Sequence, residues 1–427
     1  MGPAPSVGKV FSPLDKELEL LPGNLAPRQQ EHLIHLACWM PFDKAADMVC
    51  RLLGVQTNEE TARRLSERTG TWMQDAQTAE LEETELDEGD QKDHLQRCAW
   101  SVDGAMVPLT HKQWAEVRTL AIGEPQERRN AKGERELHVG KLSYFSRLAD
   151  ASTFCDLASV ELRRRGVDIA KQVAATTDGA DWCQTFTDMH RPDAVRILDF
   201  PHGSEHINIL LEALRNAGLH FPVQMLDRSL HVLKHRGPRS LLRMADRLPD
   251  DLAQKEEVRL QLNYLRKREA MMQYQEFQRD GWPIGSGMVE SANKNVVETR
   301  LKGPGMHWER KNVNPMLALR NAVCNERWLE MWQKAYRQYD LQDALRRTSR
   351  AEQQAEALLA VCNPALLSSP PLPPQSPPPQ PLGPAQVPSV APVSQPASTL
   401  PGSSRPSAHH PWKRGPSCRP STFATGI

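Results

Sequence analysis

The sequence predicts an α/β fold: a mixed sheet with flanking helices, interrupted by an all-helical insertion, preceded by a helical N-terminal region (residues 1–95) and followed by a disordered tail. Apolar residues recur at helical spacing in the N-terminal region, and five strand-like segments lie between residues 98 and 200. Residues 219–280 lack strand patterns and are rich in Leu, Gln and Arg. Three strands followed by alternating helices and strands are typical of a mixed sheet.

The N-terminal region contains a helix-turn-helix outline at about residues 42–70. A helical apolar pattern stops at Gly54, and Thr57 with Glu60 then forms a T-x-x-E capping box for a second helix that leads to Gly70. The second helix of such a unit can lie in a DNA groove, although an ordinary helical hairpin has this outline too. In the first case three arginines could reach phosphates or base edges: Arg63, Arg64 and Arg68.

Carboxylates interrupt or end three of the predicted strands. The strands span residues 98–109, 114–123, 141–149, 171–179 and 194–200, with a helical pattern at 151–166 before the fourth. Asp103 interrupts the first strand, whereas Asp178 and Asp199 end the fourth and fifth, each before an amphipathic helix. We expect the first part of a core at residues 96–205 and the helical insertion at 206–280.

A further carboxylate, Glu290, lies in the second part of the core, expected at residues 281–335 and followed by a C-terminal helix at 336–363. A helix is predicted from about Met288 to Leu301. At about 100° per residue, Glu290 shares its face with Asn293, Lys294, Val297 and Leu301. A carboxylate beside apolar neighbours is costly unless a cation or hydrogen bonds compensate it.

Asp103, Asp178 and Glu290 could converge on one site. Converging carboxylates repel one another unless cations neutralise them, and Mg²⁺ or Mn²⁺ prefers such oxygen ligands. Two ions could activate a nucleophile and stabilise the leaving oxygen of a phosphodiester. The open alternative is that the strand-end aspartates only cap the helices that follow them.

Four segments carry a resemblance to a known family: SVDGAMVP, TTDGADW, ILDFPHGSEH and PIGSGMVESANKNVVETRLKGPGMHW. They resemble the bacterial insertion-sequence DDE transposases of the ISKra type, relatives of the Mutator-like transposases with an RNase H-like catalytic core. The resemblance covers roughly residues 8–335. It implies that Asp103, Asp178 and Glu290 are the catalytic, metal-binding acids, separated by 75 and 112 residues with the insertion before the glutamate.

Two neighbouring positions complicate the assignment. Asp199 and His202 match the D-x-x-H element that lies beside the catalytic centre of Mutator-like transposases, and Asp199 could replace Asp178 as a metal ligand. Glu298 is the alternative to Glu290, but it pairs plausibly with Lys294 or Lys302 at a spacing of four residues.

A zinc site is the competing interpretation of residues 202–206. HGSEH fits H-x-x-E-H, in which His202 and His206 would share a helix face. A third ligand would be needed, such as Glu276, and in the alternative His206 simply packs or forms a hydrogen bond.

Contacts with DNA are expected from local basic segments, residues 227–247 and 291–320. Trp308 could stack on an unpaired base, as could Trp282, or both could belong to the core. The residues expected to bind DNA around the glutamate are Lys294, Arg300, Lys302 and Trp308.

Composition limits the cellular setting. The chain has 53 Lys and Arg against 53 Asp and Glu, so its formal net charge is zero. An acidic run at residues 80–93 is interpreted as a solvated connector. The tail at residues 364–427 has four basic and no acidic residues. That tail holds 18 of the 34 prolines, which predicts disorder. No apolar run of membrane-spanning length, no signal pattern and no C-x-x-C motif are present, so a cytoplasmic protein with no membrane partner is expected.

The resemblance implies a Mg²⁺-dependent DNA transposase that binds terminal inverted repeats and target DNA, cleaves, and joins the freed 3′-hydroxyl to the target. Pairing two element ends implies a homodimer or higher assembly on DNA, associated with the bacterial nucleoid. A catalytically inactive, transposase-derived DNA-binding protein and an RNase H-like structure-specific nuclease are the alternatives.

Overall fold

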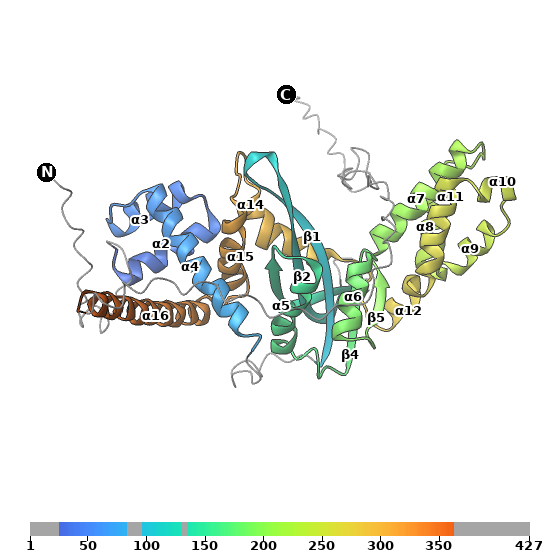
Figure 1. The fold of residues 1–427 in the computed structure, drawn as a ribbon. Coiled ribbons are helices and arrows are strands. Elements are labelled where there is room, and N and C mark those ends of the chain that lie inside the picture. Colours follow the sequence, from blue (N-terminus) through green and yellow to red (C-terminus); the bar gives the residue numbers. More distant parts are fainter. Residues whose placement is uncertain (1–24, 83–95, 130–132, 134, 363–427) are drawn as a thin grey trace, which may run out of the picture. The chain divides into compact units, whose positions relative to one another are not determined.

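The computed structural model describes residues 25–82, 96–129, 133 and 135–362 (Figure 1). The chain divides into two compact units, Met1–Ala357 and Leu358–Ile427. The tail predicted at residues 364–427 and most of the acidic connector lie outside the described residues. Within the described part of the chain, no helix combines the length and the apolarity needed to cross a membrane.

A five-stranded mixed sheet has the strand order β3-β2-β1-β4-β5 (Figure 1). Its first three strands form an antiparallel meander, and its last two run parallel to β1. All five predicted strands, and the mixed sheet, are confirmed. Their bounds are β1 Arg97–Pro108, β2 Trp114–Arg129, β3 Arg135–Arg147, β4 Gln172–Thr177 and β5 Val195–Leu198.

The alternation of side chains along β1 separates two cores. Trp100 and Val102 face α5 (Ala151–Arg164) and α6 (Asp181–His190), in a cluster that contains Phe154 and Phe186. Ala99 points to the opposite face and packs against α13 (Gly287–Ala292). Because successive side chains of a strand alternate between faces, Asp103 lies on the α13 face of the sheet.

Asparagine side chains cover the free edge of β3. Two asparagines of α15 (Arg310–Cys324) and the residue that caps its C-terminus, Asn325, each accept a hydrogen bond from a backbone N–H of the edge and donate one to the carbonyl of that residue, at 2.8–3.1 Å. An exposed strand edge would otherwise offer these groups to another chain. The pairs are Asn314 with Leu148, Asn321 with Ser146 and Asn325 with Tyr144.

The N-terminal region is helical, with α2 (Pro27–Trp39), α3 (Phe42–Leu53) and α4 (Glu59–Ala79). Gly54 ends α3 in the left-handed conformation, φ 65°, as predicted. The capping prediction was wrong by one residue, because the Asn58 side chain accepts from the Thr61 N–H at 2.8 Å. The helix-turn-helix outline is therefore present as two packed helices, although α4 is longer than expected.

In the described structure, every regular element between Phe200 and Arg279 is a helix, as the pattern of the sequence predicts. The helices are α7 Phe200–Asn216, α8 Met225–Arg236, α9 Arg239–Ala245, α10 Asp250–Ala253, α11 Glu256–Lys267 and α12 Tyr274–Arg279. After α13 the helix continues through a π-helical segment, Asn293–Glu298, into α14 (Thr299–Leu301). The helix predicted at 336–363 begins earlier, since α16 spans Trp328–Cys362.

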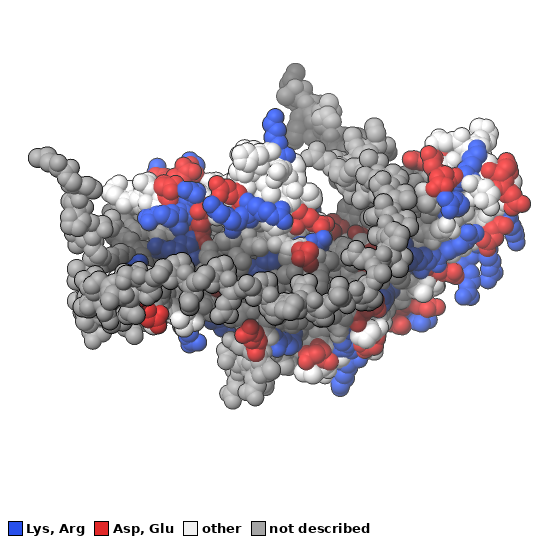
Figure 2. All heavy atoms as spheres, viewed as in Figure 1, with Lys and Arg blue, Asp and Glu red and all other residues white. Residues whose placement is uncertain are grey.

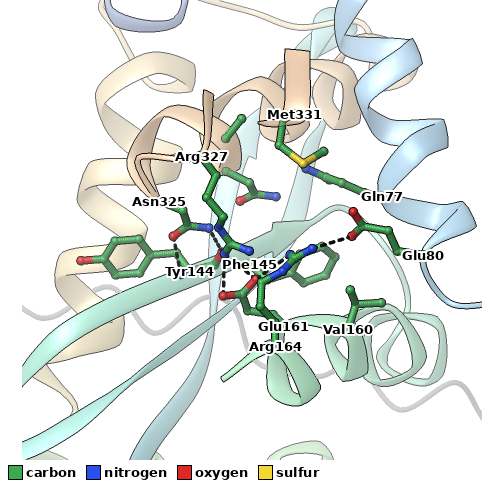
Figure 3. Close-up of a pocket in the computed structure, with 12 residues that line it drawn as sticks. Gln77, Glu80, Tyr144, Phe145, Val160, Glu161, Arg164, Asn325, Arg327 and Met331 are labelled. Atoms are coloured by element: carbon green, nitrogen blue, oxygen red, sulfur yellow. Dashed lines mark hydrogen bonds and ion pairs between the residues drawn. The ribbon is translucent and has the colours of Figure 1, made fainter. Parts of the chain in front are cut away.

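A buried ion network joins α4, α5 and α16 beside a small cavity (Figure 3). Glu161 accepts from Arg327 at 2.6 Å, and Glu80 pairs with Lys334 at 2.6 Å and with Arg164 at 3.3 Å. Burial would raise the pKa of Glu161, but the nearby cations Arg327 and Arg164 together outweigh it and hold that pKa below its usual value. Glu80 was predicted to lie in a solvated connector, and its burial in this network corrects that prediction.

Gly70 does not end its helix, contrary to the prediction, but lies where α4 passes closest to α15. A Cβ atom at this position would lie 2.4 Å from the carbonyl oxygen of Pro315 and 2.7 Å from its carbonyl carbon. Real Cβ atoms do not approach backbone atoms this closely, so the packing of the two helices requires glycine here.

We predict that Gly70→Ala lowers the free energy of unfolding by about 1–3 kcal/mol, because α4 and α15 must move apart. Helix propensity alone would stabilise the variant by up to about 1 kcal/mol, so the sign of the change separates the two effects. Urea denaturation measures it, with exposed Thr71→Ala of α4 as the control. A Gly70→Ala protein as stable as wild type would contradict the close approach.

Candidate functional site

The register of three adjacent parallel strands brings three aspartates to one level of the sheet. Each residue of β1 pairs with the residue 75 positions later in β4, from Arg97 with Gln172 to Trp100 with Ala175. Each residue of β4 pairs with the residue 21 positions later in β5. The last pairs are Trp100 with Ala175 and Thr177 with Leu198, and the same two offsets, continued past them, would match Asp103 with Asp178 and Asp178 with Asp199. Registered residues of parallel strands point to one face, which here is the α13 face.

The helix that carries Glu290 lies over this level. The amide of Asn293 donates to Oδ2 of Asp103 at 3.0 Å, and the Ser286 N–H donates to Oδ1 of Asp199 at 2.7 Å. The Ser286 hydroxyl also contacts Oε1 of Glu290 at 3.3 Å. Short hydrogen bonds thus connect the Glu290 helix to two of the three strands that bear the aspartates.

The π-helical segment modifies the predicted face of this helix. Asn293, Val297 and Leu301 are buried as that face requires, but Lys294 is exposed. A π-helical turn holds more residues than an α-helical turn and therefore shifts the side chains that follow it around the axis. Lys294, the second residue of the π-helical segment, faces solvent, while Asn293 contacts Asp103.

The electrostatics of the aspartates show that they lie close to other carboxylates. Burial, opposed by the Gly104 N–H and reinforced by Asp178 and Glu290, raises the pKa of Asp103 to about 6. Burial, opposed by the Ser286 N–H and reinforced by Glu290, also raises the pKa of Asp199 to about 6. Unneutralised negative charge therefore gathers at this level of the sheet.

Asp178 and Asp199 differ in how their oxygens are engaged. Asp199 caps α7, since its Oδ2 accepts from the His202 N–H at 3.3 Å while Oδ1 accepts from Ser286. Oδ1 of Asp178 accepts from the Ala180 N–H at 2.8 Å and from the Cys183 thiol at 3.5 Å. Within the described part of the chain no hydrogen bond to Oδ2 of Asp178 is present. The capping interpretation thus fits Asp199, and Asp178 retains the more available carboxylate oxygen.

The donor set of the site suits a hard cation. It consists of carboxylates and one amide, and Oδ1 of Asn293 is buried without a hydrogen-bond partner in the described structure. Among the described residues, no group of three His, Cys, Asp or Glu side chains is arranged closely enough to hold a metal ion as it stands. By the chemistry of their oxygen atoms, Asp103, Asp178, Glu290 and Asn293 are the residues that fit Mg²⁺ or Mn²⁺.

The histidines of HGSEH are separately engaged. His206 shares a 2.6 Å hydrogen bond with Gln261 and stacks on Tyr264, with ring centroids 3.5 Å apart. His202 is half-buried, and its Nδ1 lies 4.0 Å from Oε2 of Glu205. These contacts favour the packing interpretation of His206, and the described residues provide no zinc-binding group.

Two of the expected DNA-binding residues are buried. Arg300 is only 1% exposed and donates to the carbonyl of Ala37 at 2.7 Å, while its guanidinium lies over Phe42 and Trp308. The Trp308 indole donates to the Leu301 carbonyl at 3.2 Å. Both residues hold the N-terminal helices against the core, which corrects the prediction that they contact DNA and supports the core alternative for Trp308.

The remaining basic candidates vary in exposure. Arg64 and Lys294 are exposed, Arg63 pairs with Glu60 and Glu67, and Lys302 pairs with Glu298 at 2.6 Å, as predicted for that glutamate. Arg68 is half-buried, with its guanidinium over Trp72. Figure 2 shows both acidic and basic side chains over the helices at the right of the view.

The sequence analysis gave no role to five residues that contact the aspartates or, for Arg268, the backbone of the next residue: Cys183, Ser286, Asn293, Tyr264 and Arg268. Asn293 was placed on the face of Glu290 but given no role. Tyr264 and Arg268 lie in an ordinary amphipathic helix pattern, and no local signal distinguishes them.

No protein-family model matches this chain, and a search of the curated proteins finds no match. The similarity to ISKra-type transposases accordingly stays a prediction from the sequence motifs.

We predict that Asp103→Asn stabilises the metal-free protein at neutral pH. The folded protein holds the proton on Asp103 more tightly than the unfolded chain, so the associated stability is present below about pH 4 and is lost as the pH rises through about 6. At pH 7.5 the variant should gain about 1–3 kcal/mol in the free energy of unfolding, and at pH 4 far less.

Urea denaturation in EDTA at both pH values measures this difference. Exposed Asp168→Asn is the matched control, with an expected change within about 0.5 kcal/mol. If Asp103→Asn is no more stable than wild type at pH 7.5, the ionised Asp103 carboxylate does not destabilise the folded protein, and the prediction is wrong.

Proposed function

We propose that the protein is a DNA transposase of an insertion sequence that cleaves and joins DNA by a metal-dependent DDE mechanism. The observation that supports it most is the alignment of Asp103, Asp178 and Asp199 at one level of the sheet beneath the helix of Glu290. The sequence motifs supply the substrate class, because a carboxylate cluster alone does not specify DNA.

The strand order supports an RNase H-like core. An antiparallel meander followed by two strands parallel to the first strand places the first acid on central β1 and the second after neighbouring β4. The third acid comes from a helix that follows the insertion, against the α13 face. This arrangement brings together residues that are 75 and 112 positions apart in the sequence.

Asp103, Asp178 and Glu290 would hold two Mg²⁺ or Mn²⁺ ions. When bound, such ions supply Lewis-acid activation of the nucleophile and the scissile phosphate. The chain's own contribution is orientation: the Gly104 N–H and Asn293 fix Asp103, the Ala180 N–H fixes Asp178, and Ser286 fixes Glu290. Water would first break a phosphodiester and free the 3′-oxygen of the element, which would then attack a target phosphodiester and release a target 3′-oxygen.

We expect Asp103→Ala and Glu290→Gln each to lower strand transfer more than about 100-fold, because each removes a carboxylate that would hold the cations. The substrate is labelled duplex from the DNA that flanks the reading frame, assayed in Mg²⁺ and Mn²⁺. Glu298→Gln is the matched control, since Glu298 pairs with Lys302, and it should retain most activity. Asp178→Asn should be more damaging than Asp199→Asn.

The products separate this proposal from its alternatives. Full joining by Asp103→Ala or Glu290→Gln protein would overturn the catalytic assignment. Hydrolysis without joining would assign an RNase H-like nuclease, and binding without cleavage in either metal would assign an inactive DNA-binding derivative.

We predict that exposed Arg64 and Lys294 contact DNA phosphates. Arg64→Ala and Lys294→Ala should weaken binding about equally across sequences and reduce the slope of log affinity against log salt concentration by about 0.9 each. Fluorescence anisotropy with flanking-end duplexes measures this slope. Arg28→Ala is the control, because exposed Arg28 already pairs with Glu31 at 2.9 Å, and it should leave the slope unchanged. An unchanged slope for Arg64→Ala would argue that α4 does not contact DNA.

A further inference from the structure

Two side chains of the helical insertion hold the backbone that carries the second acid. The Tyr264 hydroxyl, on α11, donates to the backbone carbonyl of Asp178 at 2.9 Å. Arg268, which ends α11, donates to the next carbonyl, that of Gly179, from Nε at 3.1 Å and from Nη2 at 2.5 Å. Two consecutive carbonyls between β4 and α6 are thus bound by the insertion.

Stacking holds these two side chains in place. The Arg268 guanidinium lies 3.7 Å from the centroid of the Tyr264 ring, and the His206 ring stacks on Tyr264 at 3.5 Å and 18°. Gln261 in turn bonds Nδ1 of His206 at 2.6 Å. Arg268 is buried, so its hydrogen bonds to the Gly179 carbonyl form away from bulk water.

The backbone at Gly179 matches this arrangement. Its φ of +80° lies in the left-handed region, and a Cβ atom there would lie 2.6 Å from Nε of Arg268. Glycine therefore allows both the turn after Asp178 and the approach of the guanidinium. Because the carbonyls on both sides of this turn are fixed, the direction of the Asp178 side chain is fixed with them.

We propose that Tyr264 and Arg268 are positioning residues for Asp178, so that α11 and the residue that follows it support the cation-binding site. This inference rests on the proposed function, in which Asp178 holds a divalent cation. Mg²⁺ requires near-ideal octahedral geometry, whereas Ca²⁺ accepts irregular geometry. A loosened Asp178 should therefore weaken Mg²⁺ binding more than Ca²⁺ binding.

The test uses the full chain carrying Tyr264→Phe or Arg268→Lys. The first variant keeps the stacked ring and removes only the hydroxyl, and the second keeps the charge and removes the planar fork of donors. Isothermal titration with MgCl₂ and with CaCl₂ should show about three- to tenfold weaker Mg²⁺ affinity in each, and a smaller loss for Ca²⁺. The thermal midpoint without metal should stay close to wild type.

Matched controls carry the corresponding changes elsewhere. Tyr339→Phe removes a hydroxyl from a ring that packs on Trp72, and Arg259→Lys changes an exposed arginine of α11 that pairs with Glu256. Both should bind Mg²⁺ as wild type does.

Unchanged Mg²⁺ affinity in both test variants would overturn the positioning role. Equal losses for Mg²⁺ and Ca²⁺ together with a lower thermal midpoint would also overturn it, because those changes indicate a purely structural role. The Asp103→Asn variant distinguishes failure of the proposed function from failure of the positioning role. If Asp103→Asn binds Mg²⁺ normally, the proposed function itself fails; if it loses binding while Tyr264→Phe and Arg268→Lys do not, only the present inference fails.

Discussion

The hydrogen-bond register of β1, β4 and β5 is the constraint on which the rest of the site depends. A shift of one residue between β1 and β4 would turn the side chains of one strand to the opposite face and separate Asp103 from Asp178. The register is held by apolar residues that fill both faces, Trp100 on one and Ala99 on the other, and by the Ser101 hydroxyl, which donates to the Thr176 carbonyl at 2.5 Å. The packing of the core therefore sets the spacing of the carboxylates.

This arrangement has an energetic cost that the structure offsets only in part. Backbone N–H groups of Gly104, Ala180, Ser286 and His202 and the Asn293 amide donate to the aspartates, yet burial and neighbouring charge still leave Asp103 and Asp199 with raised pKa values. Donors that were sufficient to stabilise the ionised carboxylates would lower those pKa values. A bound cation would relieve the remaining deficit, so the lost stability and the proposed cation binding would have one physical origin.

Local signals predicted the strands, because a two-residue alternation such as that of β1 is visible within a short window. They also predicted the helices of the insertion and the pairing of Glu298 with Lys302. They did not predict tertiary neighbours: Arg300 looks like a surface cation in its own segment, but its partner is the carbonyl of Ala37, 263 residues away. Gly70 has the sequence character of a helix end, and only the position of Pro315 shows why glycine is required there.

The helices between Phe200 and Ile284 explain why Asp178 could be chosen from the sequence while its support could not. The chain leaves the sheet after β5, and the Phe200 N–H donates to the Ile284 carbonyl at 2.9 Å, so the two ends of this helical segment lie together. The length of such a segment does not affect the position of Glu290. α11 binds the carbonyls of Asp178 and Gly179, groups that almost any residue type would present. Hydrogen bonds to backbone carbonyls do not constrain the residue type at position 178, so they cannot be predicted from that residue. They do require glycine at position 179, where a Cβ atom would meet Arg268.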